Sequence, residues 1–268
     1  MDIIKDDLKF IFLPTCRKCG VILTDENWYV SHKKIHKHIC KECECKRARK
    51  WRQDNIDRHN QLKRESNHRL IDEVIDVYGG KCACCGETRR EYLTIDHVNG
   101  GGNKQKREMG FLTSQVLYRW LKQNNYPKGF QVLCFNCNCG KRNYSVCPHN
   151  KEIFEKKFGI KLKESKYARY TWKLRLGIIK GYGGKCELCG EDNPHFLTVD
   201  HTNGGGRKER KIFGGPLAFY RKLRDENYPK GNYRLLCYNC NCALGFNRIT
   251  EDNLINLRSQ ERDTKNDK

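Results

Sequence analysis

The chain has 268 residues, of which 37% are hydrophobic and 32% charged, and its formal net charge is +21. So low an apolar content disfavours one large core and favours small modules that are held together by metal. We find no signal peptide and no run of about eighteen apolar residues, the length that spans a bilayer. We therefore expect a soluble, cytoplasmic protein with no membrane partner.

The 17 cysteines recur mainly as CxxC pairs. Pairs at fixed distances are typical of zinc sites, whereas disulfide scaffolds are usually shorter secreted chains. We expect a reducing compartment and about three structural Zn²⁺ ions, each held by four thiolates. Such sites lower the formal charge by about six, to roughly +15. A surplus of this size favours a polyanionic partner, and nucleic acid is the commonest one.

The first CxxC pairs lie near the N-terminus and have the spacing of one zinc site. The expected ligands are Cys16, Cys19, Cys40 and Cys43. His36 and His38 are alternative ligands, and Cys45 is left over. The basic stretch KRARKWR follows directly and predicts a helix that either contacts phosphate or faces solvent.

The rest of the chain contains a duplication. LTIDHVNGGG at residues 93–102 returns as LTVDHTNGGG at 197–206, and LCFNCNC at 133–139 returns as LCYNCNC at 236–242. Each copy begins with the phrase GGKC at the end of a predicted helix. Self-similarity at this regular offset indicates two structural repeats.

Each copy predicts the same order of elements. A cysteine pair leads into a short apolar strand, a glycine-rich loop, a helix, a second short strand and a last helix that opens at the second cysteine pair. The middle helix is expected near residues 111–124 and 217–226. This order predicts an α+β fold that is closed by zinc in each copy.

These patterns predict six segments. They are a zinc finger (1–50), a basic helical linker (51–78), repeat unit 1 (79–142), a linker with a helix (143–182, the linker itself being 143–165), repeat unit 2 (183–249), and a C-terminal helix with a charged tail (250–268).

Four cysteines in each repeat are expected to hold one structural zinc, because four thiolates leave no open coordination position for catalysis. They are Cys82, Cys85, Cys134 and Cys137 in the first repeat, and Cys186, Cys189, Cys237 and Cys240 in the second. Cys139 and Cys242 occupy equivalent positions and are expected to face the core. Cys84 is an alternative ligand without a counterpart, since Leu188 stands at its position.

The Asp-His pair at the end of the first strand predicts a second kind of site. A carboxylate suits a hard cation such as Mg²⁺, and a neutral imidazole beside it can take a proton from water. Asn138 and Asn241 directly follow the last zinc cysteine and offer an amide oxygen. The expected sites are Asp96, His97 and Asn138 in the first repeat, and Asp200, His201 and Asn241 in the second.

Taken together, CxxC, Asp-His and LCxxCN resemble the HNH, or His-Me finger (ββα-metal), endonucleases. The resemblance covers roughly residues 79–142 and 183–248. It implies two tandem ββα-metal units that hydrolyse phosphodiester bonds, most typically in double-stranded DNA, in a phage-encoded or homing nuclease. It also implies that His97 and His201 are general bases, and that Asp96 with Asn138, and Asp200 with Asn241, hold Mg²⁺ or Mn²⁺ against the scissile phosphate.

The repeats depart from the family pattern at several positions. The middle Asn of the motif has no firm equivalent: Asn232 stands there in the second repeat and Phe130 in the first, with Asn99 or Asn203 as substitutes. The three glycines after Asp-His-x-Asn either let backbone approach phosphate or simply make the loop flexible.

The second repeat also lacks the trailing lysine, which is Lys141 in the first, and reads CALGF. This sequence resembles phage endonuclease VII-type resolvases, and the N-terminal finger resembles small treble-clef modules. The alternatives to a two-site endonuclease are a structure-selective junction resolvase and a nucleic-acid-binding zinc protein in which one or both repeats have lost catalysis.

Overall fold

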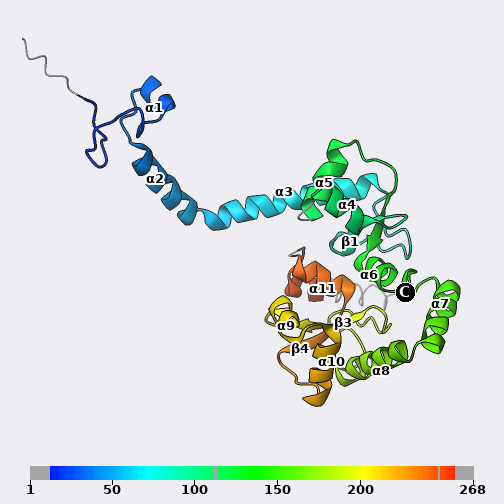
Figure 1. Cartoon of the computed structure of the whole chain (residues 1–268). Helices are drawn as coiled ribbons and strands as arrows, with labels where there is room; N and C mark the ends of the chain where they lie inside the picture. Colours follow the sequence, from blue (N-terminus) through cyan, green and yellow to red (C-terminus); the bar gives the residue numbers. More distant parts are fainter. Residues whose placement is uncertain (1–12, 111–113, 247, 257–268) are drawn as a thin grey trace, which may run out of the picture. The chain divides into compact units, whose positions relative to one another are not determined.

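The structure is a computed structural model that describes residues 13–110, 114–246 and 248–256. The chain divides into two compact units between Asn67 and His68, and both repeats belong to the second unit (Figure 1). Within the described residues, no helix is long and apolar enough to cross a membrane.

The described part of the first unit before Asn55 is built on short bridges and two helices. Isolated bridges join Thr15 to Ile22 and Trp28 to Cys40. Helix α1 spans Val30–Lys34 and α2 spans Lys41–Asp54. Its small core consists of Cys16, Leu23 and Cys40. So small an apolar core is typical of units that a bound metal can help to stabilise.

The basic helix predicted through residues 46–78 is interrupted once. Helix α2 ends at Asp54, and α3 (Ile56–Val77) begins after Asn55. The backbone N–H and the side-chain amide of Asn55 both donate to the carbonyl of Trp51, at 3.0 and 2.8 Å. Asparagine breaks the helix here because its side chain competes with the backbone for hydrogen bonds.

Each repeat folds as the predicted strand, loop with helix, strand and helix. Strand β1 (Leu93–His97) follows the short 3-10 helix η1 (Arg90–Tyr92) and pairs antiparallel with β2 (Phe130–Cys134). In the second repeat β3 (Leu197–His201) pairs with β4 (Tyr233–Cys237). The last helices are α6 (Phe135–Tyr144) and α11 (Tyr238–Gly245). The α+β prediction is therefore confirmed.

The connection between the two strands holds two helices rather than one. In the first repeat they are α4 (Gly102–Glu108) and α5 (Ser114–Gln123), and in the second α9 (Gly206–Phe213) and α10 (Pro216–Asp225). The predicted glycine-rich loop is shorter than the glycine triplet, because the third glycine already starts α4 and α9. Gly101 and Gly205, the second glycines, have positive φ and act as the N-caps. Residues 111–113, the start of the predicted middle helix, lie outside the described residues.

The segment predicted as a linker, residues 143–165, contains a helix that the sequence did not predict. Helix α7 spans Lys151–Glu164, because Asn150 caps it by accepting a hydrogen bond from the backbone N–H of Ile153. The next helix, α8 (Lys166–Gly181), begins after Ser165 as expected. Residues 251–256 are helical, as predicted for the C-terminal segment.

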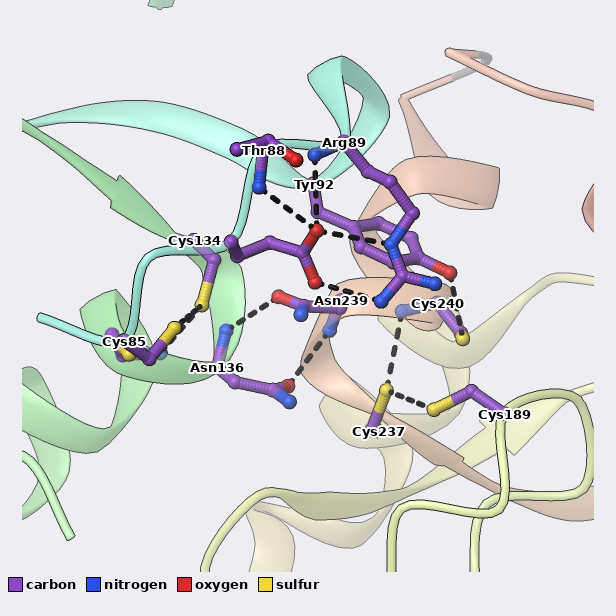
Figure 2. A network of polar contacts seen from close by, with 12 residues as sticks. Cys85, Thr88, Arg89, Tyr92, Cys134, Asn136, Cys189, Cys237, Asn239 and Cys240 are labelled. Carbon is purple, nitrogen blue, oxygen red and sulfur yellow. Dashed lines mark hydrogen bonds and ion pairs between the residues drawn. The ribbon is translucent and has the colours of Figure 1, made fainter. Parts of the chain in front are cut away.

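The two repeats pack against each other through α6 and α11. The side-chain oxygen of Asn239 accepts from the backbone N–H of Asn136 at 2.8 Å, and the side-chain oxygen of Asn136 accepts from the backbone N–H of Asn239 at 2.9 Å (Figure 2). These two are the buried polar residues of the described chain, at 4% and 6% exposure. Reciprocal contacts between equivalent residues are the mark of an isologous, twofold interface.

Arginines from non-equivalent positions reach equivalent carbonyls in the two repeats. Arg248, which follows α11, donates to the carbonyl of Leu93 in the first repeat, and Arg175 on α8 donates to the carbonyl of Leu197 in the second. Apolar residues of both repeats, including Leu133 and Leu236, belong to one core cluster. The duplicated sequence therefore forms one pseudo-dimeric body.

We predict that Asn136→Ala destabilises this body by about 1–3 kcal/mol, because it leaves the buried N–H of Asn239 without an acceptor. Urea unfolding in excess zinc measures the change. Asn124→Ala, which removes an exposed side-chain contact to Trp120, is the matched control and should cost less than about 0.5 kcal/mol. Equal losses in both variants would contradict the role given to the asparagine pair.

His195 is enclosed by aromatic rings. It stacks on Trp172 at 4.5 Å between ring centroids and meets Tyr144, Phe154 and Phe158 edge-on. Its Nδ1 is buried without a hydrogen-bond partner. Burial, with a smaller contribution from Arg175, lowers the pKa of His195 to about 4.

This histidine should make stability depend on pH. An unfolded histidine has a pKa of about 6.5. Neutral His195 therefore makes its full contribution to the free energy of unfolding above that pH, and the contribution is lost as the pH falls toward 4. We predict that the unfolding free energies of wild type and His195→Phe differ by an amount that changes across this window. Cysteine protonation affects both proteins alike, so parallel stability curves would contradict the prediction.

Candidate functional site

The predicted zinc ligands gather in space as three separate cysteine sets. In each set the sulfur atoms all lie within 4.8 Å of one another. The sets are Cys16, Cys19, Cys40 and Cys43; Cys82, Cys85, Cys134 and Cys137; and Cys186, Cys189, Cys237 and Cys240. Tetrahedral zinc with bonds of about 2.3 Å places its sulfurs about 3.8 Å apart. Sγ–Sγ distances of 3.7 Å (Cys19–Cys40) and 3.8 Å (Cys85–Cys134) fit this geometry, and Cys189 and Cys237 of the third set lie closer, at 3.1 Å.

One cysteine of each set caps the helix that follows it. The sulfurs of Cys40, Cys134 and Cys237 each accept the backbone N–H of the residue three positions on, at 3.4 Å. The positive end of a helix and its free N–H groups favour a thiolate. The second cysteine pair thus begins a helix, and the N–H groups of its first turn favour the thiolate form that a metal would bind.

Two open points about the ligands are resolved by the fold. His36 and His38 do not belong to the first set, and His38 packs edge-on against Trp28. Cys139 and Cys242 interact with each other, which lowers the pKa of Cys139 and raises that of Cys242. Cys139 is buried and Cys242 is half-buried, and each faces the other repeat.

A fourth set was missed by sequence reasoning. It consists of Cys84, Cys137, Cys147 and His149, whose ligand atoms also lie within 4.8 Å of one another. Cys147 and His149 had been assigned to the linker. The signal that was available is the Cys-Pro-His tripeptide, with its two ligand types two residues apart.

The Asp-His pair of the first repeat ends β1, as expected. The Nε2 atom of His97 lies 2.5 Å from Oε1 of Gln105 on α4. The imidazole also packs on Phe130, with ring centroids 4.7 Å apart. A Cβ atom at Gly102 would lie 2.9 Å from its Nδ1. The third glycine is therefore needed to leave room beside this nitrogen.

The second repeat holds its histidine in the same way with a different partner. The Nε2 atom of His201 bonds to a carboxylate oxygen of Glu209, the residue equivalent to Gln105. The imidazole is stacked on Phe219, with centroids 5.4 Å apart. A Cβ at Gly206 would lie 2.6 Å from Nδ1. The pairing with this residue of the loop helix is thus a shared feature of both repeats.

Glu209 is itself fixed by its neighbours. Tyr233 donates to its Oε1 at 2.6 Å, and Lys222 lies 3.4 Å from the same oxygen. Burial raises the pKa of Glu209, but the hydrogen bonds from Tyr233 and His201 outweigh burial and hold the pKa below its ordinary value. A carboxylate therefore faces His201, whereas a neutral amide faces His97.

Each aspartate next to the histidine carries a cationic neighbour. Asp96 accepts from Nζ of Lys141 at 2.6 Å and from Nε2 of Gln131 at 2.9 Å. Asp200 accepts from Nε of Arg234 at 3.1 Å. Arg234 stands where the first repeat has Gln131, and it compensates for the lysine that the second repeat lacks at Leu244. The positive charge has moved from the last helix to the second strand.

The predicted amide ligands lie in the first turns of the last helices. Asn138 precedes Lys141 by three residues on α6, so both project from one helix face. Since Lys141 reaches Asp96, that face is directed toward the end of β1. Asn138 and Asn241 are half-buried.

The group that steadies the histidine is not one of the asparagines considered from the sequence. Asn99, Asn203 and Asn232 are exposed. Gln105 and Glu209 make the contact instead. The repeat alignment pairs these two positions, but a Gln/Glu difference on a polar helix gives no signal before the helix is folded against the strand.

Comparison of the chain with protein-family models, with curated proteins and with solved structures gave no match.

Proposed function

We propose that the protein is a metal-dependent endonuclease that hydrolyses phosphodiester bonds in DNA. The observation that carries the proposal is the doubled arrangement at the strand ends, in which His97 and His201 are each held through Nε2 while an aspartate precedes them. A histidine that donates Nε2–H to a fixed oxygen keeps the lone pair of Nδ1 available for a proton.

The fixed orientation of the ring supports a general base in both repeats. Gly102 and Gly206 lie close to Nδ1, where a Cβ would stand 2.9 or 2.6 Å away, so glycine is needed there for the imidazole to keep its place. Gln105 and Glu209 hold the ring in one tautomer, in the same way that a buried carboxylate orients the histidine of a hydrolytic triad.

The oxygen donors fit a hard divalent cation. Asp96 with Asn138, and Asp200 with Asn241, offer carboxylate and amide oxygens, which suit Mg²⁺ or Mn²⁺ rather than zinc. Lys141 and Arg234 already place positive charge on these carboxylates, and a metal ion would take over that role. When bound, the ion supplies stabilisation of the charge that develops on the phosphate and on the leaving oxygen.

Charge and shape support DNA as the substrate. The net charge is +21, and no residue of α2 is buried. A helix that is polar on all sides is free to contact a partner. Lys50, Trp51 and Arg52 are exposed on it, and such residues suit the phosphate backbone and aromatic contacts of nucleic acid. The pseudo-twofold pairing of the repeats favours one catalytic site for each strand.

Two other functions have observations in their favour. The ion pairs of Asp96 and Asp200 with cationic side chains are compatible with a zinc protein that binds nucleic acid without cutting it. The pseudo-twofold body also suits a resolvase that acts on four-way junctions. Salt-sensitive DNA binding without metal-dependent cutting would favour the first, and preference for junctions over linear duplex the second.

We predict that the purified protein cuts supercoiled plasmid with Mg²⁺ or Mn²⁺. His97→Ala or His201→Ala alone should leave mainly nicking, and the double variant should be about 10²- to 10⁴-fold slower, because general-base catalysis is lost. Gel electrophoresis separates nicked from linear product. His59→Ala, which changes an exposed helical histidine, is the control. Full activity in the double variant would refute the proposed function.

A second prediction concerns the residues that orient the base. In a His97→Ala background, where nicking reports on the second repeat alone, Glu209→Ala should slow nicking by about 100-fold, because the imidazole is no longer held. Glu209→Gln should retain most of the activity, since Gln105 fills this role in the first repeat. If the Gln and Ala variants are equally slow, orientation by a neutral amide is not sufficient.

A further inference from the structure

Cys137 belongs to two ligand sets at once. It completes the predicted set with Cys82, Cys85 and Cys134, and it also completes the unpredicted set with Cys84, Cys147 and His149. Its thiol is fully buried between them, at 0% exposure. A sulfur in this position can bind two metal ions, because a thiolate has more than one lone pair.

The geometry of the second set matches a zinc site. The Nδ1 atom of His149 lies 3.2 Å from Sγ of Cys137 and 3.5 Å from Sγ of Cys147. Tetrahedral zinc, with bonds of about 2.3 Å to sulfur and 2.0–2.1 Å to nitrogen, separates such atoms by roughly 3.5 Å. The residue types also form a Cys₃His set, one of the common structural zinc sites.

Charge balance favours a second ion over a choice between the two sets. A second zinc adds two positive charges, the thiolates of Cys84 and Cys147 add two negative charges, and the imidazole adds none. The seven side chains, with Cys137 counted in both sets, complete two tetrahedra. If only one set held zinc, the other would leave cysteine side chains crowded together without a metal.

We propose that the first repeat binds two zinc ions that share the thiolate of Cys137. The ligands of this binuclear cluster are Cys82, Cys85 and Cys134 on one ion and Cys84, Cys147 and His149 on the other. This proposal is independent of the nuclease function. It raises the zinc content of the whole chain from three ions to four.

The second repeat lacks the same arrangement and provides an internal comparison. Leu188, which is buried, stands at the position of Cys84. Thr250 and Asp252 stand at the positions equivalent to Cys147 and His149. The set of Cys186, Cys189, Cys237 and Cys240 therefore takes a single zinc.

The second zinc ion has a structural consequence. It ties the segment that leaves α6 back to the first cysteine knuckle, through Cys147 and His149. His149 also packs against Phe196 of the second repeat, with ring centroids 4.8 Å apart. The second zinc thereby fixes the connection between the repeats, and it stiffens the first turn of α6, where Asn138 follows Cys137.

Native mass spectrometry of the full chain, purified with zinc and then desalted, tests the proposal. We expect four zinc ions per chain in the wild type and three in Cys84→Ser and in Cys147→Ser. Cys45→Ser is the matched control, because Cys45 lies outside all four sets, and it should retain four. Three ions in the wild type, or four in both Ser variants, would overturn the proposal.

A measurement on the unaltered chain covers the case in which a variant fails to fold. After exchange of zinc for ¹¹³Cd, NMR should show four cadmium resonances, and two of them should split each other through the shared sulfur. The resonances of the N-terminal finger and of the second repeat should remain unsplit. Four resonances without mutual splitting would show that Cys137 is not shared, and would also overturn the proposal.

Discussion

The convergence of cysteines into sets that can hold zinc is the constraint on which the rest of this structure depends. Each repeat brings together a knuckle and a helix start that are nearly fifty residues apart in sequence, next to the apolar core that the two repeats share. Without metal, the clustered thiolates would repel one another or remain protonated, and the pairing of β1 with β2 would lose its clamp. Cys134 and Cys237 of these sets also cap α6 and α11, so a metal bound there would couple to helix formation.

Duplication has a second physical effect, because it provides each repeat with a partner of matching shape. The reciprocal bonds of Asn136 and Asn239 satisfy two helix-terminal N–H groups that would otherwise be buried without acceptors. Asparagine is suited to this position since it offers an acceptor without a charge. The repeats are thus halves of one body, and their packing fixes the position of one Asp-His site relative to the other.

The two sites have diverged in charge while keeping their geometry. Gln105 faces His97 and Glu209 faces His201, and the cation beside the aspartate comes from Lys141 in one repeat and from Arg234 in the other. Both changes preserve an oxygen acceptor for the histidine and a positive neighbour for the aspartate. Such compensation keeps the same local arrangement in both repeats.

The sequence by itself determined the duplication, the three cysteine sets, the α+β order of elements and the position of Asp-His at the strand end. These features depend on local spacing and on the periodicity of strands and helices. The tertiary structure alone decided that Gln105 and Glu209 hold the histidines, that Asn136 and Asn239 join the repeats, and that Cys84, Cys147 and His149 meet at Cys137. Those contacts join residues on different elements, and they exist only once the strands, zinc knuckles and helices have packed together.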